Sequence, residues 1–426
     1  MIVKFGRTAL MAAAGLSMAL GGAGAGRAAG LSLTLWHNTQ DTQGVLALYK
    51  AYEKASGKKL VFVDIPADGF ETATLTRWAS GDRPDILEYH PGAADMAHFN
   101  PAQNLVDLSN EAFVKQSSIY EIGGRAADGK VYAAITTFPE TWGVYYNKKL
   151  LADHGLKPAT TFVELKAQCA ILSKAGVTTM HEAGASGWPV AVEPMLYAST
   201  IAPPHYVEDV LAHKAKFNDP GSPMLAGLKD WNDRKAAGCF NKDMTTATFE
   251  AGAKVVYTGT AAYQMIHSNI AAVYLDEAGG DKAKLDEKVG FVQVGATEPK
   301  TTVDAGPIGT YMVPKTGDSA KEAAALDFIR FVTGPGYSDY IKNSGTFPIV
   351  NGVSDPDASQ LLKEIKAAYD KGPRVVLINQ NVPGAFGNLM QVMSELTVGQ
   401  LAPQQSADQL QQGVVEAAQA QGLPGW

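Results

Sequence analysis

Short apolar runs alternate with amphipathic segments along the chain from Leu31 onward. Residues 31–36, 59–65 and 84–89 are apolar runs of strand length, whereas residues 44–57 and 70–81 repeat apolar positions at helical spacing. Two successive β-α-β units of this kind place the carboxyl ends of their strands at one edge of a sheet. Ligands of α/β proteins bind at such an edge, so the pattern predicts binding residues directly after these strands.

The rest of the chain continues this mixture of strands and helices. A strand is predicted to run into a helix over residues 139–151. Capping boxes predict helices that open at Thr161 with Glu164, at Ser319 with Glu322, and at Ser406 with Gln409. Further helices are predicted near 189–201, 223–237 and 268–278, and further strands at 131–138, 260–266, 289–294 and 310–314. These elements predict an α/β protein.

Length and charge narrow the class of protein. The chain has 426 residues, more than the roughly 250–300 that one hydrophobic core organises, so two lobes are expected. The formal net charge of -7 argues against a nucleic-acid partner, because such a surface would be basic. The sequence contains no P-loop, no G-x-G-x-x-G and no H-E-x-x-H motif, and we expect no cofactor.

The first residues have the layout of a secretory signal peptide. Lys4 and Arg7 precede an apolar run from Ala9 to Leu20, and small residues follow it. The run falls short of the roughly 20 residues that a membrane-spanning helix needs. We expect residues 1–28 to be removed, with cleavage after Ala25 as the alternative, and the mature protein to lie in the periplasm.

Export gives the two cysteines, Cys169 and Cys239, two possible states. They lie in separate predicted helices, and no spacing rule joins them. An oxidising compartment favours a disulfide, whereas two small buried core residues are the alternative. Both interpretations stay open at this point.

Several ordered segments resemble the family 1 extracellular solute-binding proteins, the sugar-binding subunits of ABC importers, which include maltose-binding protein. GKVYAA at 129–134 followed by TWGVYYNKKL at 141–150 is similar to that family's GKVYGLP…GLYYNKDLF segment. LTLWH, RPDIL, TFVELKAQCAIL, GTAAYQM and the run ALDFIRFVTGPGYSDYIKNSGTFPIV follow the family's order as well. The resemblance spans nearly all of the chain after the predicted signal peptide.

This resemblance implies a two-lobed periplasmic binding protein fold, in which each lobe is a mixed, mainly parallel sheet flanked by helices. The N-terminal lobe would comprise residues 29–136 and 305–345, and the C-terminal lobe residues 137–304 and 346–426. The chain would cross between lobes near 135–139, 301–305 and 332–346, and the lobes would close on a ligand by hinge bending. The implied function is that of a monomeric receptor that delivers a saccharide to an ABC transporter permease.

The family's cleft positions fall on residues of suitable chemistry. They correspond to Trp36, His37 and Asn38, to Glu88, Tyr89 and His90, to Glu140 and Trp188, to His267, Ser268 and Asn269, and to Phe386 with Asn388. A sugar site needs aromatic rings for the apolar faces of the sugar and carboxylate or amide groups for its hydroxyls. Trp36, Tyr89, Trp188 and Phe386 are the candidate rings, and Trp78 and Trp231 are expected in the core.

Three alternatives accompany this interpretation. The solute could be a polyol, glycerol phosphate or an osmolyte. Glu88 and Glu140 could be the acid and base of a glycoside-active enzyme. Residues of metal-binding type also cluster in one segment, but their spacing matches no closed zinc pattern, so we expect no metal site; they are Asp85, Glu88, His90, Asp95 and His98.

Overall fold

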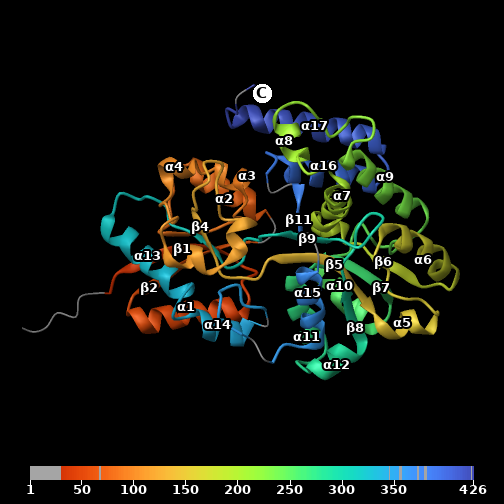
Figure 1. The fold of residues 1–426 in the computed structure, drawn as a ribbon, viewed down its shortest axis with the longest axis horizontal. Helices are drawn as coiled ribbons and strands as arrows, with labels where there is room; N and C mark the ends of the chain where they lie inside the picture. Colours follow the sequence, from red (N-terminus) through yellow and green to blue (C-terminus); the bar gives the residue numbers. More distant parts are fainter. Residues whose placement is uncertain are drawn as a thin grey trace, which may run out of the picture.

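Two β-sheets, each covered by helices on both faces, form two lobes that lie side by side (Figure 1). The computed structural model describes residues 30–66, 69–344, 346–354, 357–371, 374–378, 381–423 and 425–426. The predicted signal peptide, residues 1–28, lies outside these residues. Within the described chain, no helix combines the length and the apolar character that a membrane span requires.

The first lobe is built on a five-stranded sheet with strand order β2-β1-β3-β10-β4. Leu33 and Leu35 of β1 face one side and Trp36 faces the other, because successive side chains of a strand point to opposite faces. Helices α1, α13 and α14 cover the side of Leu33, and α2, α3 and α4 cover the side of Trp36. The elements are β1 (Ser32–Asn38), α1 (Gln43–Ser56), β2 (Lys59–Ile65), α2 (Phe70–Ala79), β3 (Ile86–Glu88), α3 (Ala93–Ala97), α4 (Pro101–Asn104), β4 (Ala133–Ile135), β10 (Thr310–Met312), α13 (Ser319–Val332) and α14 (Tyr337–Ser344).

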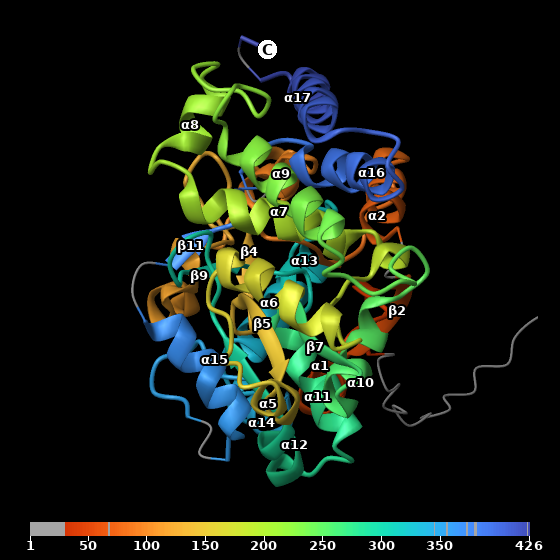
Figure 2. The same cartoon turned by 90° about the vertical axis from the view of Figure 1, so that its right-hand side faces the viewer.

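The second lobe is built on a six-stranded sheet with strand order β11-β9-β5-β7-β6, and β8 also pairs with β5. Helices α6, α7, α9, α16 and α17 share the core on one face, and α10, α11, α12 and α15 cover the other. Figure 2 shows α17 and α12 at opposite ends of this lobe. The strands are β5 (Glu140–Asn147), β6 (Thr178–His181), β7 (Ala261–His267), β8 (Val289–Val292), β9 (Thr301–Asp304) and β11 (Arg374–Val376).

The helices of the second lobe have these bounds: α5 (Lys148–Asp153), α6 (Phe162–Lys174), α7 (Trp188–Ile201), α8 (Tyr206–Leu211), α9 (Pro223–Ala236), α10 (Phe249–Thr258), α11 (Ala271–Glu277), α12 (Lys282–Lys288), α15 (Gln360–Asp370), α16 (Ala385–Thr397) and α17 (Pro403–Ala420). A 3₁₀ turn, η4 (Ser268–Ile270), links β7 to α11. Cys239 follows α9 and does not lie in a helix, contrary to the sequence-based expectation.

The chain passes from the first sheet to the second between Ile135 and Glu140, and returns between Asp304 and Thr310. The residue boundaries of the lobes stay predictions. Strands that enter a lobe through such a passage run antiparallel to their neighbours: β10 to β3 and β4, and β5 to β7, β8 and β9. The sheets are mixed, as predicted, but parallel pairing does not predominate in the second sheet, because β5 occupies its centre.

Two helix starts differ from the sequence-based expectation. Asp318, not Ser319, caps α13, and its Oδ1 accepts hydrogen bonds from the N–H groups of Ala320 and Lys321. The last helix, α17, begins at Pro403, so Ser406 lies inside it and is buried. Pro403 provides the start because its fixed φ suits the first turn of a helix.

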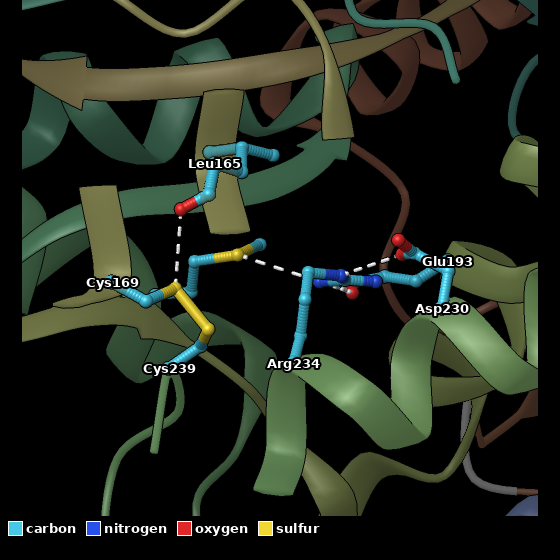
Figure 3. Close-up of a disulfide and its surroundings, with 7 residues drawn as sticks. Leu165, Cys169, Glu193, Asp230, Arg234 and Cys239 are labelled. Atoms are coloured by element: carbon cyan, nitrogen blue, oxygen red, sulfur yellow. Dashed lines mark hydrogen bonds and ion pairs between the residues drawn. A yellow bond between two sulfur atoms is a disulfide. The ribbon is translucent and has the colours of Figure 1, made fainter. Parts of the chain in front are cut away.

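Cys169 and Cys239 form a disulfide that joins α6 to the segment after α9 (Figure 3). Both cysteines are also fully buried, so the bond belongs to the core. Arg234 of α9 lies beside them: its carbonyl accepts the N–H of Cys239, and its guanidinium donates to Glu193 at 2.7 Å and Asp230 at 2.8 Å. The disulfide thus links α6 to the end of α9, the helix that carries the buried ion pairs of Arg234.

Candidate functional site

The carboxyl ends of β1 and β3 in the first lobe, and the start of β5 with the end of β7 in the second, carry most of the predicted site residues. Trp36 and Tyr89 do not face outward from this edge. Their side chains are buried in the core with Trp78, Phe70 and Phe99, and Trp36 is only 1% exposed. Both rings therefore support the first lobe from within in this conformation.

His37, Asn38 and Glu88 form a buried polar group at the end of β1 and β3. Glu88 Oε2 accepts the N–H of Asn38 and its Oε1 accepts the N–H of Gly309, both at 2.8 Å. His37 bonds to Asp41 and Asp64 through its two ring nitrogens. Burial raises the pKa of Glu88 well above its ordinary value. Glu88 therefore holds the backbone of two segments at the edge of the sheet.

His90 lies at the same edge, and carboxyl groups surround it. Its Nε2 lies 2.8 Å from Glu71 Oε1. Burial alone would lower the pKa of His90, but the hydrogen bond to Glu71 and the nearby carboxyl groups of Asp95 and Glu140 raise it to about 9. The imidazolium of His90 therefore carries a positive charge toward the second lobe, from which Glu140 comes.

Aromatic rings gather at the facing edge of the second lobe. The indole of Trp188 lies 6.2 Å from that of Trp142, 5.5 Å from the His267 ring and 5.2 Å from Phe249. Gly187, with a positive φ of 71°, precedes Trp188. Helix α7 begins at Trp188, one residue before the predicted start, so Trp188 belongs to the helix and not to the loop before it. Trp188 remains half-buried. Burial lowers the pKa of His267 to about 4, so its ring is neutral at ordinary pH.

Glu140 and Asn269 are brought together at the same edge, since each lies two residues from a ring of this group, Trp142 and His267 respectively. Asn269 Nδ2 donates to Glu140 Oε1 at 3.0 Å. Ser268 is buried, and its Oγ accepts the N–H of Thr141 at 3.1 Å. Gly306 leaves room for this carboxyl group, because a Cβ at its position would displace the Glu140 side chain. The arrangement leaves an amide and a carboxyl group, both only half-buried, next to an aromatic cluster.

Two further residues belong to this group and were not predicted. Asp304 Oδ1 accepts the indole N–H of Trp142 at 2.9 Å. Burial and the neighbouring Glu140 raise the pKa of Asp304 well above its usual range. Asp304 ends β9, and the same rule that places residues at strand ends applies to it.

Phe386 and Asn388 lie on the first turn of α16. Phe386 packs against the large core of the second lobe and is half-buried. Asn388 Nδ2 donates to the carbonyl of Gly384 at 2.8 Å and closes the start of its own helix. Both contacts lie within the second lobe, so the place of Phe386 and Asn388 in a ligand site stays a prediction.

A cavity of about 40 Å³ lies between the lobes. Thr42, Ile308 and Tyr340 line it from the first lobe, and Ser268, Asn269 and Ile365 from the second. The space is comparable to one water molecule and far below the roughly 300 Å³ of small-molecule pockets.

Comparisons with known proteins identify the class. Residues 36–339 match the family described as bacterial extracellular solute-binding protein. A multiple sugar-binding protein of Streptococcus mutans is 26% identical over 142 residues, which is about one third of this chain and one third of that relative. A chitin oligosaccharide binding protein has a TM-score of 0.77 and 22% identity, covering 91% of this chain and 99% of its own.

A sugar transporter from Bacillus licheniformis, solved in complex with stachyose, has a TM-score of 0.72 and 18% identity, covering 90% of this chain and 98% of its own. These likenesses confirm the predicted two-lobed fold, since they extend over nearly the whole described chain. The family match covers well over half of the chain. The chain therefore belongs to the bacterial extracellular solute-binding protein family.

Proposed function

We propose that the protein binds a saccharide between its lobes, with the Trp188 indole against an apolar sugar face and Glu140 and Asn269 on adjacent hydroxyl groups. The observation that carries this proposal is the half-buried ring of Trp188 next to His267, two residues before Asn269, whose amide is hydrogen-bonded to Glu140. Aromatic plates next to planar polar groups are the chemistry that a sugar requires.

The relatives support a sugar among the possible solutes. One is described as a multiple sugar-binding protein, one as a chitin oligosaccharide binding protein, and one was solved with stachyose. Solute-binding proteins of this family are non-catalytic, and a glycoside-active enzyme is set aside.

Delivery to an ABC transporter permease, in the periplasm and as a monomer, completes the proposal. The support is the family match together with the predicted signal peptide at residues 1–28. No cofactor is part of the proposal, because two packed lobes with a polar and aromatic edge suffice to hold a sugar.

A thermal-shift screen of the purified protein over mono- and oligosaccharides tests the proposal. A ligand that binds only the folded state raises the melting temperature by mass action. Polyols, glycerol phosphate and osmolytes form the comparison set. The best saccharide is then incubated with the protein and recovered by chromatography. Recovery of intact sugar is expected, and turnover above about one per second would refute the receptor function.

Binding is expected to close the lobes about the passages at residues 136–139 and 305–309. These passages join the two sheets, so the lobes can move as units while the ligand enters an open form and is then enclosed. Small-angle scattering with saturating saccharide should give a smaller radius of gyration than scattering without it. An unchanged radius would contradict hinge closure.

Trp188→Ala is expected to weaken saccharide binding by more than tenfold. Loss of about 100 Å² of apolar contact is worth about 2.5 kcal/mol at the usual coefficient. The variant should also lose about 2 kcal/mol of folding stability, because it lacks the contacts of the Trp188 indole with three neighbouring rings. Calorimetric titration gives the affinity, and urea unfolding gives the stability.

Trp78→Ala is the matched control, because this tryptophan is 6% exposed and packs in the core of the first lobe. It should cost about 3 kcal/mol or more of stability and leave the affinity of the folded protein nearly unchanged. If Trp188→Ala behaves like Trp78→Ala in both measurements, the Trp188 ring is a core residue and the proposed sugar contact is wrong.

A further inference from the structure

The end of β1 and the end of β3 bring three metal-ligating side chains together inside the first lobe. His37 is the last residue but one of β1, Asp41 follows four residues later, and Glu88 ends β3. One ligand atom from each lies within 4.8 Å of the other two, and all three residues are buried. The group differs from the cluster considered from the sequence, in which Glu88 was grouped with Asp85, His90, Asp95 and His98.

An unsatisfied oxygen points to a missing partner in this group. The Asp41 side chain is 1% exposed, and among the described residues no hydrogen-bond donor reaches its Oδ1. The carboxyl groups of Glu88 and Asp41 are both buried, and an oxygen of one lies within 4.8 Å of an oxygen of the other. Two buried carboxyl groups in contact repel each other unless a proton or a cation lies between them.

Hydrogen bonds from neighbouring residues fix the orientation of these three side chains, as is usual for metal ligands. His37 Nε2 bonds to Asp64 Oδ1 at 2.8 Å, which matches the carboxylate–histidine–metal arrangement. His37 Nδ1 lies 2.9 Å from Asp41 Oδ2, and an ion bound to both atoms would replace the proton that they share. The hydroxyl of Tyr49 donates to Asp41 Oδ2 at 2.9 Å. Backbone N–H groups of Asn38 and Gly309 fix the Glu88 carboxyl. Each ligand thus has its own supporting contact.

The distances suit a small divalent ion. Ligands at the usual 2.0–2.2 Å from a tetrahedral Zn²⁺ lie about 3.4 Å apart. His37 Nδ1 and Asp41 Oδ2 are separated by 2.9 Å, so this pair would open by about 0.5 Å. The three ligand atoms lie within 4.8 Å of one another, so the Glu88 oxygen would move inward by about 1.4 Å at most.

We propose that His37, Asp41 and Glu88 form a binding site for one divalent transition-metal ion, with Zn²⁺ as the test ion. One imidazole nitrogen and two carboxylate oxygens suit Zn²⁺ better than Ca²⁺ or Mg²⁺, which prefer oxygen ligands throughout. Asp64, whose side chain is 71% exposed, marks the side from which the ion enters. The ion would join β1, β3 and the Gly309 segment at the edge that faces the second lobe.

The test uses the untagged protein, treated with a chelator and dialysed. Titration with Zn²⁺ alone, in competition with a chelator of known affinity, should show one equivalent with a Kd of about 1 μM or tighter. Asp41→Asn should weaken binding by more than about 100-fold, and Asp64→Asn by about 10- to 100-fold. Asp64→Asn keeps the test valid if Asp41→Asn fails to fold, because Asp64 is exposed.

Glu71→Gln is the matched control, because Glu71 pairs with His90 at 2.8 Å in the same lobe but outside the proposed site. Its Zn²⁺ affinity should equal that of the wild type. Co²⁺ should give visible absorption bands that Asp41→Asn and Asp64→Asn reduce. Uptake below about 0.2 equivalents, or equal affinity in all variants, would show a hydrogen-bonded cluster without a metal and overturn the proposal. No saccharide is present, so the result is independent of the proposed sugar binding.

Discussion

Arg234→Met is expected to destabilise the protein by about 3–5 kcal/mol, measured by urea unfolding. The Arg234 guanidinium is fully buried, and it pairs with Glu193 at 2.7 Å and Asp230 at 2.8 Å (Figure 3). Removing it leaves the carboxyl group of Glu193, whose side chain is 3% exposed, without its cation. The cost arises mainly from that uncompensated buried charge.

The packing of Arg234 adds to this loss. Its guanidinium lies 5.0 Å from the Phe162 ring and 5.3 Å from the Phe240 ring, so aromatic faces cover it. Methionine restores part of the apolar contact but none of the charge. The variant therefore separates charge from packing better than alanine would.

Lys166→Met is the matched control on the neighbouring helix α6. Its Nζ lies 2.7 Å from Asp233 of α9, but both side chains are largely exposed. Exposed ion pairs contribute about 1 kcal/mol or less. If Arg234→Met lowers the free energy of unfolding by no more than Lys166→Met does, burial does not strengthen the ion pairs of Arg234.

The positions of most elements could be predicted from the sequence because the apolar pattern is strong. The strand predicted at residues 59–65 is β2 (Lys59–Ile65), and the helix predicted at 44–57 is α1 (Gln43–Ser56). Trp78 and Trp231 are buried, as predicted from their helix faces. The apolar periodicity of each segment sufficed to predict these features, because they do not depend on contacts between distant residues.

Side-chain direction at the site was harder to predict. Trp36 and His37 were both expected in the cleft, yet neighbouring residues of a strand point to opposite faces. Trp36 packs on the side of α2, and His37 packs against Tyr49 of α1 with ring centroids 6.3 Å apart. The alternation was visible in the sequence, but which face each helix covers depends on the tertiary fold.

Contacts between distant residues could not be predicted at all. Trp142 and Asp304 are 162 positions apart and come together only because β5 and β9 are neighbours. The same holds for His37 and Asp64, which meet across the β1–β2 pair. No local spacing encodes these pairs, so the sequence showed the strand ends but not the polar groups that form there.

The Cys169–Cys239 bond gives the second large effect, and its removal in a Cys169→Ala/Cys239→Ala variant is expected to cost about 2–4 kcal/mol. The bond closes a loop with a sequence separation of 70, and the chain-entropy model assigns about 4 kcal/mol to a loop of this length. Loss of two fully buried sulfur atoms acts in the same direction. Urea unfolding of the wild type and the double variant measures the difference.

Reduction of the wild type gives an independent check on this expectation. Because both sulfur atoms are inaccessible to solvent, a thiol reductant should act only after the second lobe opens, so native reduction should follow the rate of unfolding. Reduction should also loosen the α9 end that carries Arg234, since Cys239 donates its N–H to the Arg234 carbonyl. A double variant with the unfolding midpoint of the wild type would show that packing around α6 and α9 holds this region without the covalent bond.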